Sequence, residues 1–460
     1  MMGRQADQPA FVYDFALDRH VPAAHMLRSI DRFVELKELR VHLAPFYCTT
    51  GRPSIDPELL IRMLLVGYCY GIRSERRLCE EVHLNLAYRW FCRLGLDGAV
   101  PDHSTFSKNR HGRFRESDLF RQLFETVVRR AIKEGLVGGE GFAVDASLIA
   151  ADANKQRSVP GTEGTDWQSL AATRRSVQEY LDTLDEAAWG TASEVTPKFI
   201  ATADPAAQWT GAHKGHAFFA YSDNYLIDLK ASIIVDVEPT RAIRQAEVGA
   251  TKTMIERTEE RFGLKPQRLA GDTAYGSAEI LNWIVNEKNI APHVALWDKT
   301  ERSDGIFSLS DFTFDAEANS YTCPAGKLLL QYRKPFTKPR TGVVWGNRRL
   351  YRAERRDCAA CPLKAKCCPG PDPRKLSVSV HEAARDIVRS LRDTPEYLQS
   401  RRERKKVEML FAHLKRILHL GRLRLRGPCG ARDEFTLAAI AQNLRKLAKL
   451  IPMPQPAMAI

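Results

Sequence analysis

Apolar residues recur at helical spacing near the end of the chain, across residues 401–427. The stripe predicts an amphipathic helix that Gly421 ends, and it consists of Val407, Leu410, Phe411, Leu414, Ile417 and Leu418. At about 100° per residue, Arg404 and Lys415 fall on the same helix face as Glu408. A lone carboxylate among cations indicates either a functional site or a solvated basic helix with one ion pair.

The hydrophobic pattern of residues 1–135 predicts short helices joined by tight turns. Asp56 precedes Pro57, which is typical of an N-cap followed by the first helical position. Ser74 is placed to begin the next helix, and a later helix starts near Pro101 and carries basic residues. We expect an all-α, helix-turn-helix-like domain that binds DNA, with a dimerisation bundle as the alternative.

Two aspartates interrupt patterns that otherwise predict β-strands. Asp145 stands inside the apolar run 141–150, where an unpaired carboxylate is costly. Asp272 follows the strand-like run 267–271, at a strand end where open α/β sheets place ligands. The ordinary alternatives are an aspartate facing water at a strand edge and an aspartate capping a turn.

Residues 298–385 carry short alternating strands and a group of cysteines. Cys358 and Cys361 have the CxxC spacing of a zinc knuckle, and Cys323 and Cys367 complete a set of four thiolates, with Cys368 as an alternative fourth ligand. We expect a structural Zn²⁺ that stabilises this lobe. Free thiols or a redox CxxC are the alternatives.

Charge points to a polyanionic partner. The formal net charge is +13, and residues 401–426 hold ten Lys and Arg against two Glu. Arg422, Arg424 and Arg426 alternate with leucines, so their side chains share one side of an extended segment that suits DNA phosphates. No apolar run has the roughly 18 residues of a membrane span. The ten scattered cysteines favour a reducing, cytoplasmic setting.

The motifs resemble those of bacterial insertion-sequence DDE transposases of the cut-and-paste type. Arg404, Glu408 and Lys415 match the R-x3-E-x6-K signature of that family. GRPSIDPELLIRMLL, SERRLCEEV and PDHSTFSKNR resemble its N-terminal domain, and DTAYGS resembles its second acidic motif. The run K-x6-Y-x6-D, formed by Lys214, Tyr221 and Asp228, resembles its central strands.

The resemblance implies a ribonuclease-H-like catalytic domain over residues 136–460, with 298–385 inserted in it. It implies that Asp145, Asp272 and Glu408 hold two Mg²⁺ or Mn²⁺ ions for DNA cleavage and strand transfer. Arg404 and Lys415 then contact DNA near the cut, and a homodimer on double-stranded DNA, associated with the nucleoid, is the expected assembly. The signature's usual tyrosine falls at Arg401, with Tyr397 one turn earlier.

Two other functions share these features. An inactive or domesticated derivative would bind DNA as a regulator without cutting it. A plain nuclease would cut DNA and never join ends.

Overall fold

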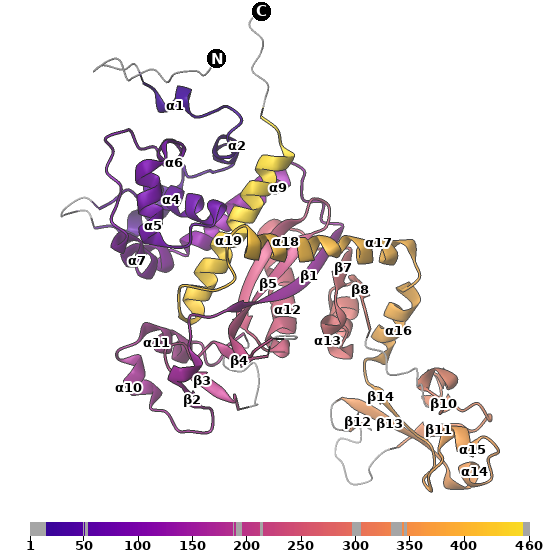
Figure 1. The fold of residues 1–460 in the computed structure, drawn as a ribbon. Coiled ribbons are helices and arrows are strands. Elements are labelled where there is room, and N and C mark those ends of the chain that lie inside the picture. The colour runs from indigo at the N-terminus through magenta and orange to yellow at the C-terminus, as the bar shows by residue number, and fades with distance from the viewer. Residues whose placement is uncertain are drawn as a thin grey trace, which may run out of the picture. The chain divides into compact units, whose positions relative to one another are not determined.

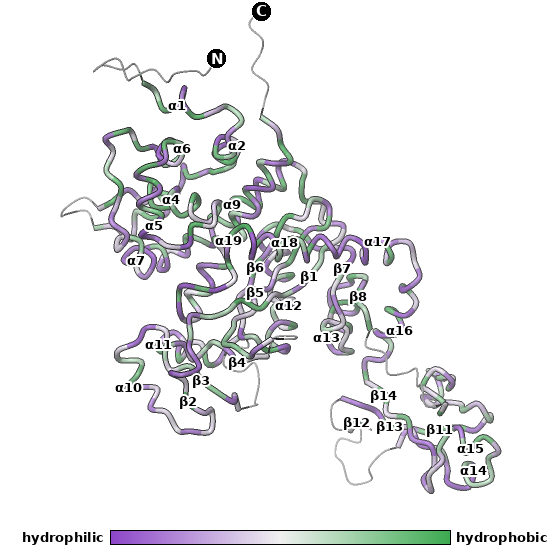
Figure 2. The backbone as a smooth tube through the Cα atoms, viewed as in Figure 1, coloured by the Kyte–Doolittle hydropathy of each residue, from purple (hydrophilic) through white to green (hydrophobic). Residues whose placement is uncertain are grey.

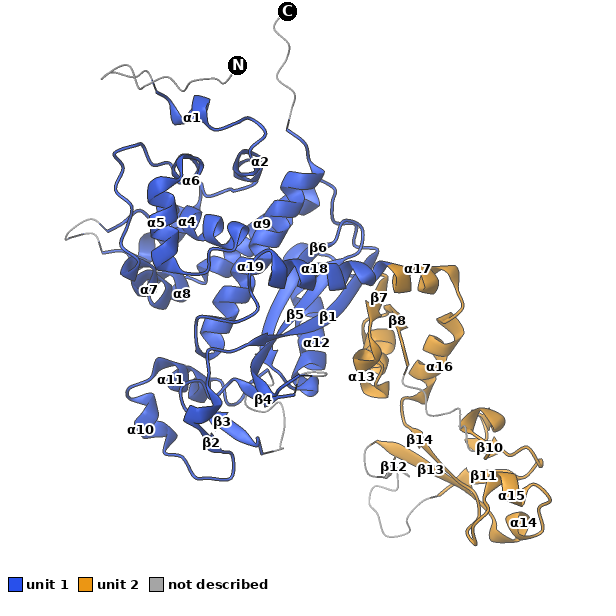
Figure 3. Ribbon diagram, in the orientation of Figure 1, with its two compact units in different colours: residues 1–266, 403–460 blue, residues 267–402 orange. Residues whose placement is uncertain are grey.

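The computed structural model describes residues 15–48, 50, 54–186, 188–189, 196–211, 215–296, 305–332, 343–344 and 347–453. The chain divides into two compact units (Figure 3): residues 1–266 with 403–460, and residues 267–402. The predicted mixed α/β class is confirmed. This division differs from the predicted domains 1–135 and 136–460. The reason is that the C-terminal helix, Gly427–Leu450, packs on helices from both of the predicted domains.

The described residues before the first strand form helices α1–α9 (Figure 1). Their bounds are Leu17–His20, Met26–Asp31, Leu39–Leu43, Pro57–Tyr70, Glu75–Leu84, Leu86–Phe91, Ser104–His111, Arg113–Glu116 and Leu119–Lys133, with a 3-10 turn at Ala44–Phe46. The predicted caps are confirmed: Asp56 accepts the Glu58 N–H at 2.9 Å, and Ser74 accepts the Arg77 N–H at 3.4 Å. Gly71, at a φ of 69°, ends α4 and begins the tight turn to α5.

The first unit is built on a sheet whose central strand is β5 (Phe218–Asp228). This strand pairs antiparallel with β1 (Gly141–Ala150), β6 (Ile233–Arg241) and β4 (Gln208–Thr210). Nearly all of β5 is buried. The segment between β1 and β4 forms a 3-10 turn at Lys155–Arg157, then β2 (Ser158–Pro160), α10 (Trp167–Ala171), α11 (Arg175–Asp182) and β3 (Phe199–Ala201).

Two long helices, α12 (Arg244–Phe262) and α19 (Gly427–Leu450), pack on β6. The helix α19 is buried over most of its length because it also contacts α4, α9 and α11. Asn443 on α19 accepts the Ile234 N–H at 2.9 Å and donates to the Ile234 carbonyl at 2.8 Å. A helix side chain therefore satisfies backbone groups of β6 that no strand pairs with.

The helix predicted from 401 to Gly421 is wrong in its bounds. Residue Arg404 separates α17 (Pro395–Glu403) from α18 (Lys405–Arg416). The predicted apolar stripe holds in part along α18 (Figure 2), where Val407, Phe411 and Leu414 are buried. Ile417, also predicted in the stripe, is 46% exposed because it follows the end of α18. Gly421 does not cap this helix, because its carbonyl accepts the Ala150 N–H at 3.2 Å and it already lies beside β1.

The second unit contains a parallel pair, β7 (Arg268–Gly271) and β8 (Ala291–Val294). Between them, α13 (Ala278–Asn282) continues into a π-helix at Trp283–Glu287. The parallel strand predicted before Asp272 is therefore confirmed.

The second unit also holds a small antiparallel sheet of order β12-β13-β11-β10-β9, with β14 on β13. Its strands are β9 (Thr313–Asp315), β10 (Ser320–Thr322), β11 (Leu328–Gln331), β12 (Val343–Val344), β13 (Arg348–Ala353) and β14 (Lys375–Ser379). The unit's other elements are a 3-10 turn at Leu309–Asp311, α14 (Arg355–Ala359), α15 (Lys364–Cys367) and α16 (Glu382–Leu391). Buried Leu329, Tyr321 and Tyr351 form much of the small core of this sheet.

Candidate active site and nucleic-acid surface

The strand β1 holds Asp145 at its middle, in register with Tyr225 on β5. Side chains directly opposite each other in an antiparallel pair share one face of the sheet. The Asp145 side chain is 19% exposed, and its Oδ1 accepts the N–H of Ala146 at 2.9 Å. The carboxylate is therefore partly buried but reachable from solvent.

Arg404 brings Asp145 and Glu408 together. Its guanidinium lies 4.0 Å from Asp145 Oδ2 and 3.8 Å from Glu408 Oε1. Glu408 is one helical turn after Arg404 and is 63% exposed, so its carboxylate faces solvent. The first and third predicted acids thus share one cation, although they are 263 positions apart in sequence (408 − 145).

Sequence reasoning missed a further carboxylate on this face of the sheet. Asp223 is fully buried on β5 and pairs in register with Ser147, two residues along β1 from Asp145. Burial raises the pKa of Asp223 well above its usual range, while the Tyr225 hydroxyl and the Lys415 ammonium oppose that shift. An acid inside the apolar run FFAYSDNYLID was the available signal.

Lys415, predicted to contact DNA, interacts electrostatically with Asp223. Burial of the ammonium lowers the pKa of Lys415, and the Asp223 carboxylate acts in the opposite direction. The lysine also lines a groove and keeps solvent access. The Lys415 ammonium therefore interacts electrostatically with an internal acid while its side chain remains exposed at the surface.

In the second unit, Asp272 follows β7 and begins a 3-10 turn, Thr273–Tyr275. Its Oδ1 accepts the Ala274 N–H at 2.7 Å, so the capping role considered from the sequence is present. The side chain is half-buried. A single capping bond leaves further carboxylate lone pairs for a cation.

The family signature has a tyrosine at the position of Arg401, and the nearest tyrosine, Tyr397, lies in the second unit. Tyr397 lies on α17, and its buried hydroxyl donates to the Val294 carbonyl at 3.1 Å. This bond ties α17 to β8. Tyr397 is therefore engaged structurally, and Arg401 occupies the position where the family signature has its tyrosine.

After α18 the chain runs beside β1 as an extended ribbon. Leu423 donates to the Ala150 carbonyl at 2.7 Å, which fixes Arg422, Arg424 and the segment up to Arg426 next to the end of the Asp145 strand. All three arginines are exposed. Arg422 and Arg426 each lie 2.8 Å from a carboxylate oxygen of Asp152.

The motif residues of the central strands have structural partners. Tyr221 donates to buried Asp204 at 2.5 Å, and Asp228 accepts the N–H groups of Gly138 and Gly139 at 2.9 and 2.8 Å. Lys214 lies outside the described residues. These bonds hold β5 to the segments before β1 and β4.

The cysteines of the second unit gather only in part as predicted. Cys367 belongs to the core of the small sheet, and Cys323, Cys358 and Cys368 pack against it. Cys361 is not in this cluster. Burial raises the pKa of Cys367 to about 12. Among the described residues, no group of three or more His, Cys, Asp or Glu side chains is arranged as a metal site.

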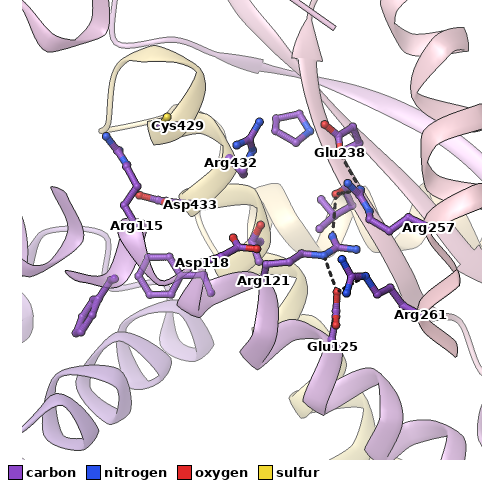
Figure 4. Close-up of a pocket in the computed structure, with 15 residues that line it drawn as sticks. Arg115, Asp118, Arg121, Glu125, Glu238, Arg257, Arg261, Cys429, Arg432 and Asp433 are labelled. Atoms are coloured by element: carbon purple, nitrogen blue, oxygen red, sulfur yellow. Dashed lines mark hydrogen bonds and ion pairs between the residues drawn. The ribbon is translucent and has the colours of Figure 1, made fainter. Parts of the chain in front are cut away.

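A polar pocket of about 350 Å³ between α9, α12 and α19 lies apart from these residues (Figure 4). Arg121 pairs with Glu125 at 3.3 Å, and Arg257 pairs with Glu238 at 2.7 Å. Most of its arginines are paired with acids, so we interpret the pocket as an ion-pair network that holds helices to β6.

Two family models match the chain. Residues 15–112 match a family described as a transposase domain (DUF772), and residues 322–448 match a transposase DDE domain. The second match contains Arg404 and Glu408, whereas Asp145 and Asp272 lie outside both. The matches confirm the resemblance found in the motifs: the chain carries a transposase domain and a transposase DDE domain.

One solved structure is similar over much of the chain. It is titled "Cryo-EM structure of piggyBac transposase synaptic complex with hairpin DNA (SNHP)". The identity is 10% and the TM-score 0.33, over 94% of this chain and 83% of the other. None of the helices in the described part of the chain is long and apolar enough to cross a bilayer.

Proposed function

We propose that this transposase binds the inverted repeats at the ends of a bacterial insertion sequence, cuts the DNA there, and joins the ends to a target. The observation that carries the proposal is the position of Arg404, within 4.0 Å of both Asp145 and Glu408. Asp145 and Glu408 are distant in sequence, yet both lie beside the same arginine. They are the first and third acids that the family resemblance implies.

The donor set suits a hard divalent cation. Asp145 and Glu408 offer carboxylate oxygens, which Mg²⁺ and Mn²⁺ prefer. Arg404 supplies positive charge beside both of them. Asp145, Asp272 and Glu408 would together hold the two ions. Bound there, the ions would activate a water or 3′-hydroxyl and stabilise the leaving 3′-oxygen during in-line displacement at phosphorus.

The remaining residues of the site position DNA. Arg404 would exchange its long-range carboxylate contacts for a phosphate next to the cut, because guanidinium groups bind phosphate in a planar, two-pronged manner. Lys415 and the three ribbon arginines would hold phosphates farther along the strand. The proposal requires the second unit to bring Asp272 to the same ions, and it expects a homodimer that pairs two element ends.

The test is cleavage of a labelled duplex that carries the element's inverted repeat, with Mg²⁺ or Mn²⁺. Asp145→Asn, Asp272→Asn and Glu408→Gln should each abolish cutting and retain DNA binding. Glu403→Gln is the matched control, because Glu403 lies on the same segment and pairs with Lys406 at 3.6 Å. Retained cutting in any of the first three variants removes that residue from the site.

The same assay separates the other two functions. Binding by the wild-type protein without metal-dependent cutting would support the regulatory derivative. Cutting without joining to a second duplex would support the plain nuclease. Cutting at the repeat boundary followed by joining is the result expected of the transposase.

A further inference from the structure

A basic groove runs through the first unit between its N-terminal helices and the closing ribbon. It consists of two adjoining hollows, of about 970 and 350 Å³, that share Arg73 and Arg424. One wall is the α4–α5 turn with the start of α5, and the other is the end of α18 with the ribbon. We call it the Arg424 groove.

Both walls of the Arg424 groove are fixed to each other. His419 Nδ1 lies 3.2 Å from the Gly71 carbonyl, which joins the end of α18 to the α4–α5 turn. Buried Glu434 forms an ion pair with Arg73 and accepts the backbone N–H groups of Arg424 and Leu425 at 2.6 Å each. The groove is therefore formed before any ligand arrives.

Some cations of the groove are already neutralised by acids. Arg73 is paired with Glu434, and Arg110 is 2.5 Å from Glu75. These four groups hold the walls and leave no charge for a ligand.

Other cations remain available. Among the described residues, neither Arg76 nor Arg424 has a carboxylate within ion-pair distance, and both side chains are exposed. Arg77 is 71% exposed and meets only Glu81, at 3.2 Å. In the larger hollow the one acid among the described lining residues is Asp152, which pairs with Arg422. In the polar pocket of Figure 4, by contrast, four of the five lining arginines lie within ion-pair distance of an acid.

The geometry points to the phosphate backbone of double-stranded DNA as the occupant of the Arg424 groove, with Asp152 holding the place of a phosphate until DNA arrives. This inference rests on the proposed function and adds the N-terminal helices as a second wall of the DNA path. Single-strand sites stack bases on exposed aromatic rings. Here the lining tyrosines are Tyr70, whose ring packs on Tyr88 at 5.1 Å, and Tyr68, which is buried with Arg73 over its ring at 4.3 Å. Neither ring is free to stack on a base, so the lining favours backbone contacts.

The groove begins where the Asp145 strand ends. Ala150, which pairs with the ribbon, lies five positions after Asp145 on β1. At about 3.3 Å per residue the separation is roughly 17 Å, or about five base pairs of duplex. Contacts in the groove should therefore fall about five base pairs from the cut.

The experiment measures DNA affinity against salt by fluorescence anisotropy, with full-length protein made cleavage-inactive by Glu408→Gln. The probes are a labelled duplex that extends beyond the cut site and a single strand of the same length. The variants Arg76→Ala, Arg424→Ala and their combination should weaken duplex binding. Each single variant should lower the slope of log affinity against log salt by about 1, and the combination by about 2. Asp152→Asn should tighten duplex binding, because it removes the competing carboxylate.

Arg129→Ala is the matched control, since Arg129 is 53% exposed and lies outside the groove. Arg76→Lys and Arg424→Lys should retain most of the binding, which separates loss of charge from loss of folding. An unchanged salt slope in the double variant overturns the inference. A larger loss for the single strand than for the duplex also overturns it. Because anisotropy measures binding and not cleavage, neither result depends on whether the proposed chemistry is correct.

Discussion

The ring of Phe411 on α18 stacks on the ring of Tyr225 on β5, with centroids 4.9 Å apart and planes 12° apart. Tyr225 is also the residue directly opposite Asp145. Its hydroxyl donates to Gln442 at 3.0 Å, and Gln442 donates to the Leu410 carbonyl of α18 at 2.8 Å. The ring stack and the Gln442 hydrogen bonds together hold α18, which carries Glu408, against β5, the strand that pairs with the strand of Asp145.

Phe411→Ala should therefore affect both stability and chemistry. Removing a buried ring costs about 3 kcal/mol or more in the free energy of unfolding. It also frees α18, so cleavage should fall more than the unfolded fraction explains. Urea unfolding and the cleavage rate of the folded protein measure the two effects. Met409→Ala, on the same helix but 69% exposed, should change neither; equal effects of both variants would contradict the role of the stack.

Lys415 and Asp223 should be energetically coupled. Lys415→Met leaves the buried Asp223 carboxylate without its nearby cation. In an Asp223→Asn background there is no carboxylate at position 223, so Lys415→Met removes no favourable charge interaction there. The double-mutant cycle should give a coupling of roughly 0.5–3 kcal/mol in the free energy of unfolding. Additive effects would show that Lys415 acts at the surface alone.

Asp204 should make stability depend on pH. It is fully buried, and burial raises its pKa to about 7, whereas the Tyr221 hydroxyl and the Gly427 N–H lower it in part. Between its ordinary value of 3.8 and about 7, the native carboxyl keeps a proton that the unfolded chain has released. The native state therefore binds more protons, and the free energy of unfolding falls as pH rises through this window.

The matched variant is Asp204→Asn, which keeps a polar partner for Tyr221 and cannot ionise. Its free energy of unfolding should fall less than that of the wild type between pH 4 and pH 7. Urea titrations across that window measure the difference. Buried Asp433, whose pKa burial also raises to about 7, contributes equally to both proteins. Parallel pH profiles would show that Asp204 stays neutral or stays charged throughout.

Features set by local spacing could be predicted from the sequence. Arg404 and Glu408 are one turn apart, so their proximity follows from helical periodicity, and Asp56 caps α4 through its near neighbours. Features set by distant packing could not. The burial of Asp223 depends on α18 covering β5, and the role of Gly421 depends on its pairing with β1.

The same limit applies to the cysteines. The spacing of Cys358 and Cys361 is visible in the sequence, but which thiols lie close together depends on how the core of the small sheet packs. That core collects Cys323, Cys358, Cys367 and Cys368 and leaves Cys361 out. Packing therefore favours Cys368, the alternative fourth ligand, over Cys361.

A structural zinc in this lobe should depend on the four packed thiols. Although the described thiols are not arranged as a metal site, the zinc predicted from the sequence would give about one Zn²⁺ per chain in protein purified without chelator, the number that four thiolates bind. Cys368→Ser should lose the metal, and Cys361→Ser should retain it. Burial raises the pKa of Cys367 to about 12, so a bound cation is needed to keep that thiol ionised at neutral pH. Metal analysis of the two variants measures the outcome. Zinc lost from Cys361→Ser but kept by Cys368→Ser would restore the ligand set predicted from spacing, and metal-free wild-type protein would make the cluster a core of free thiols.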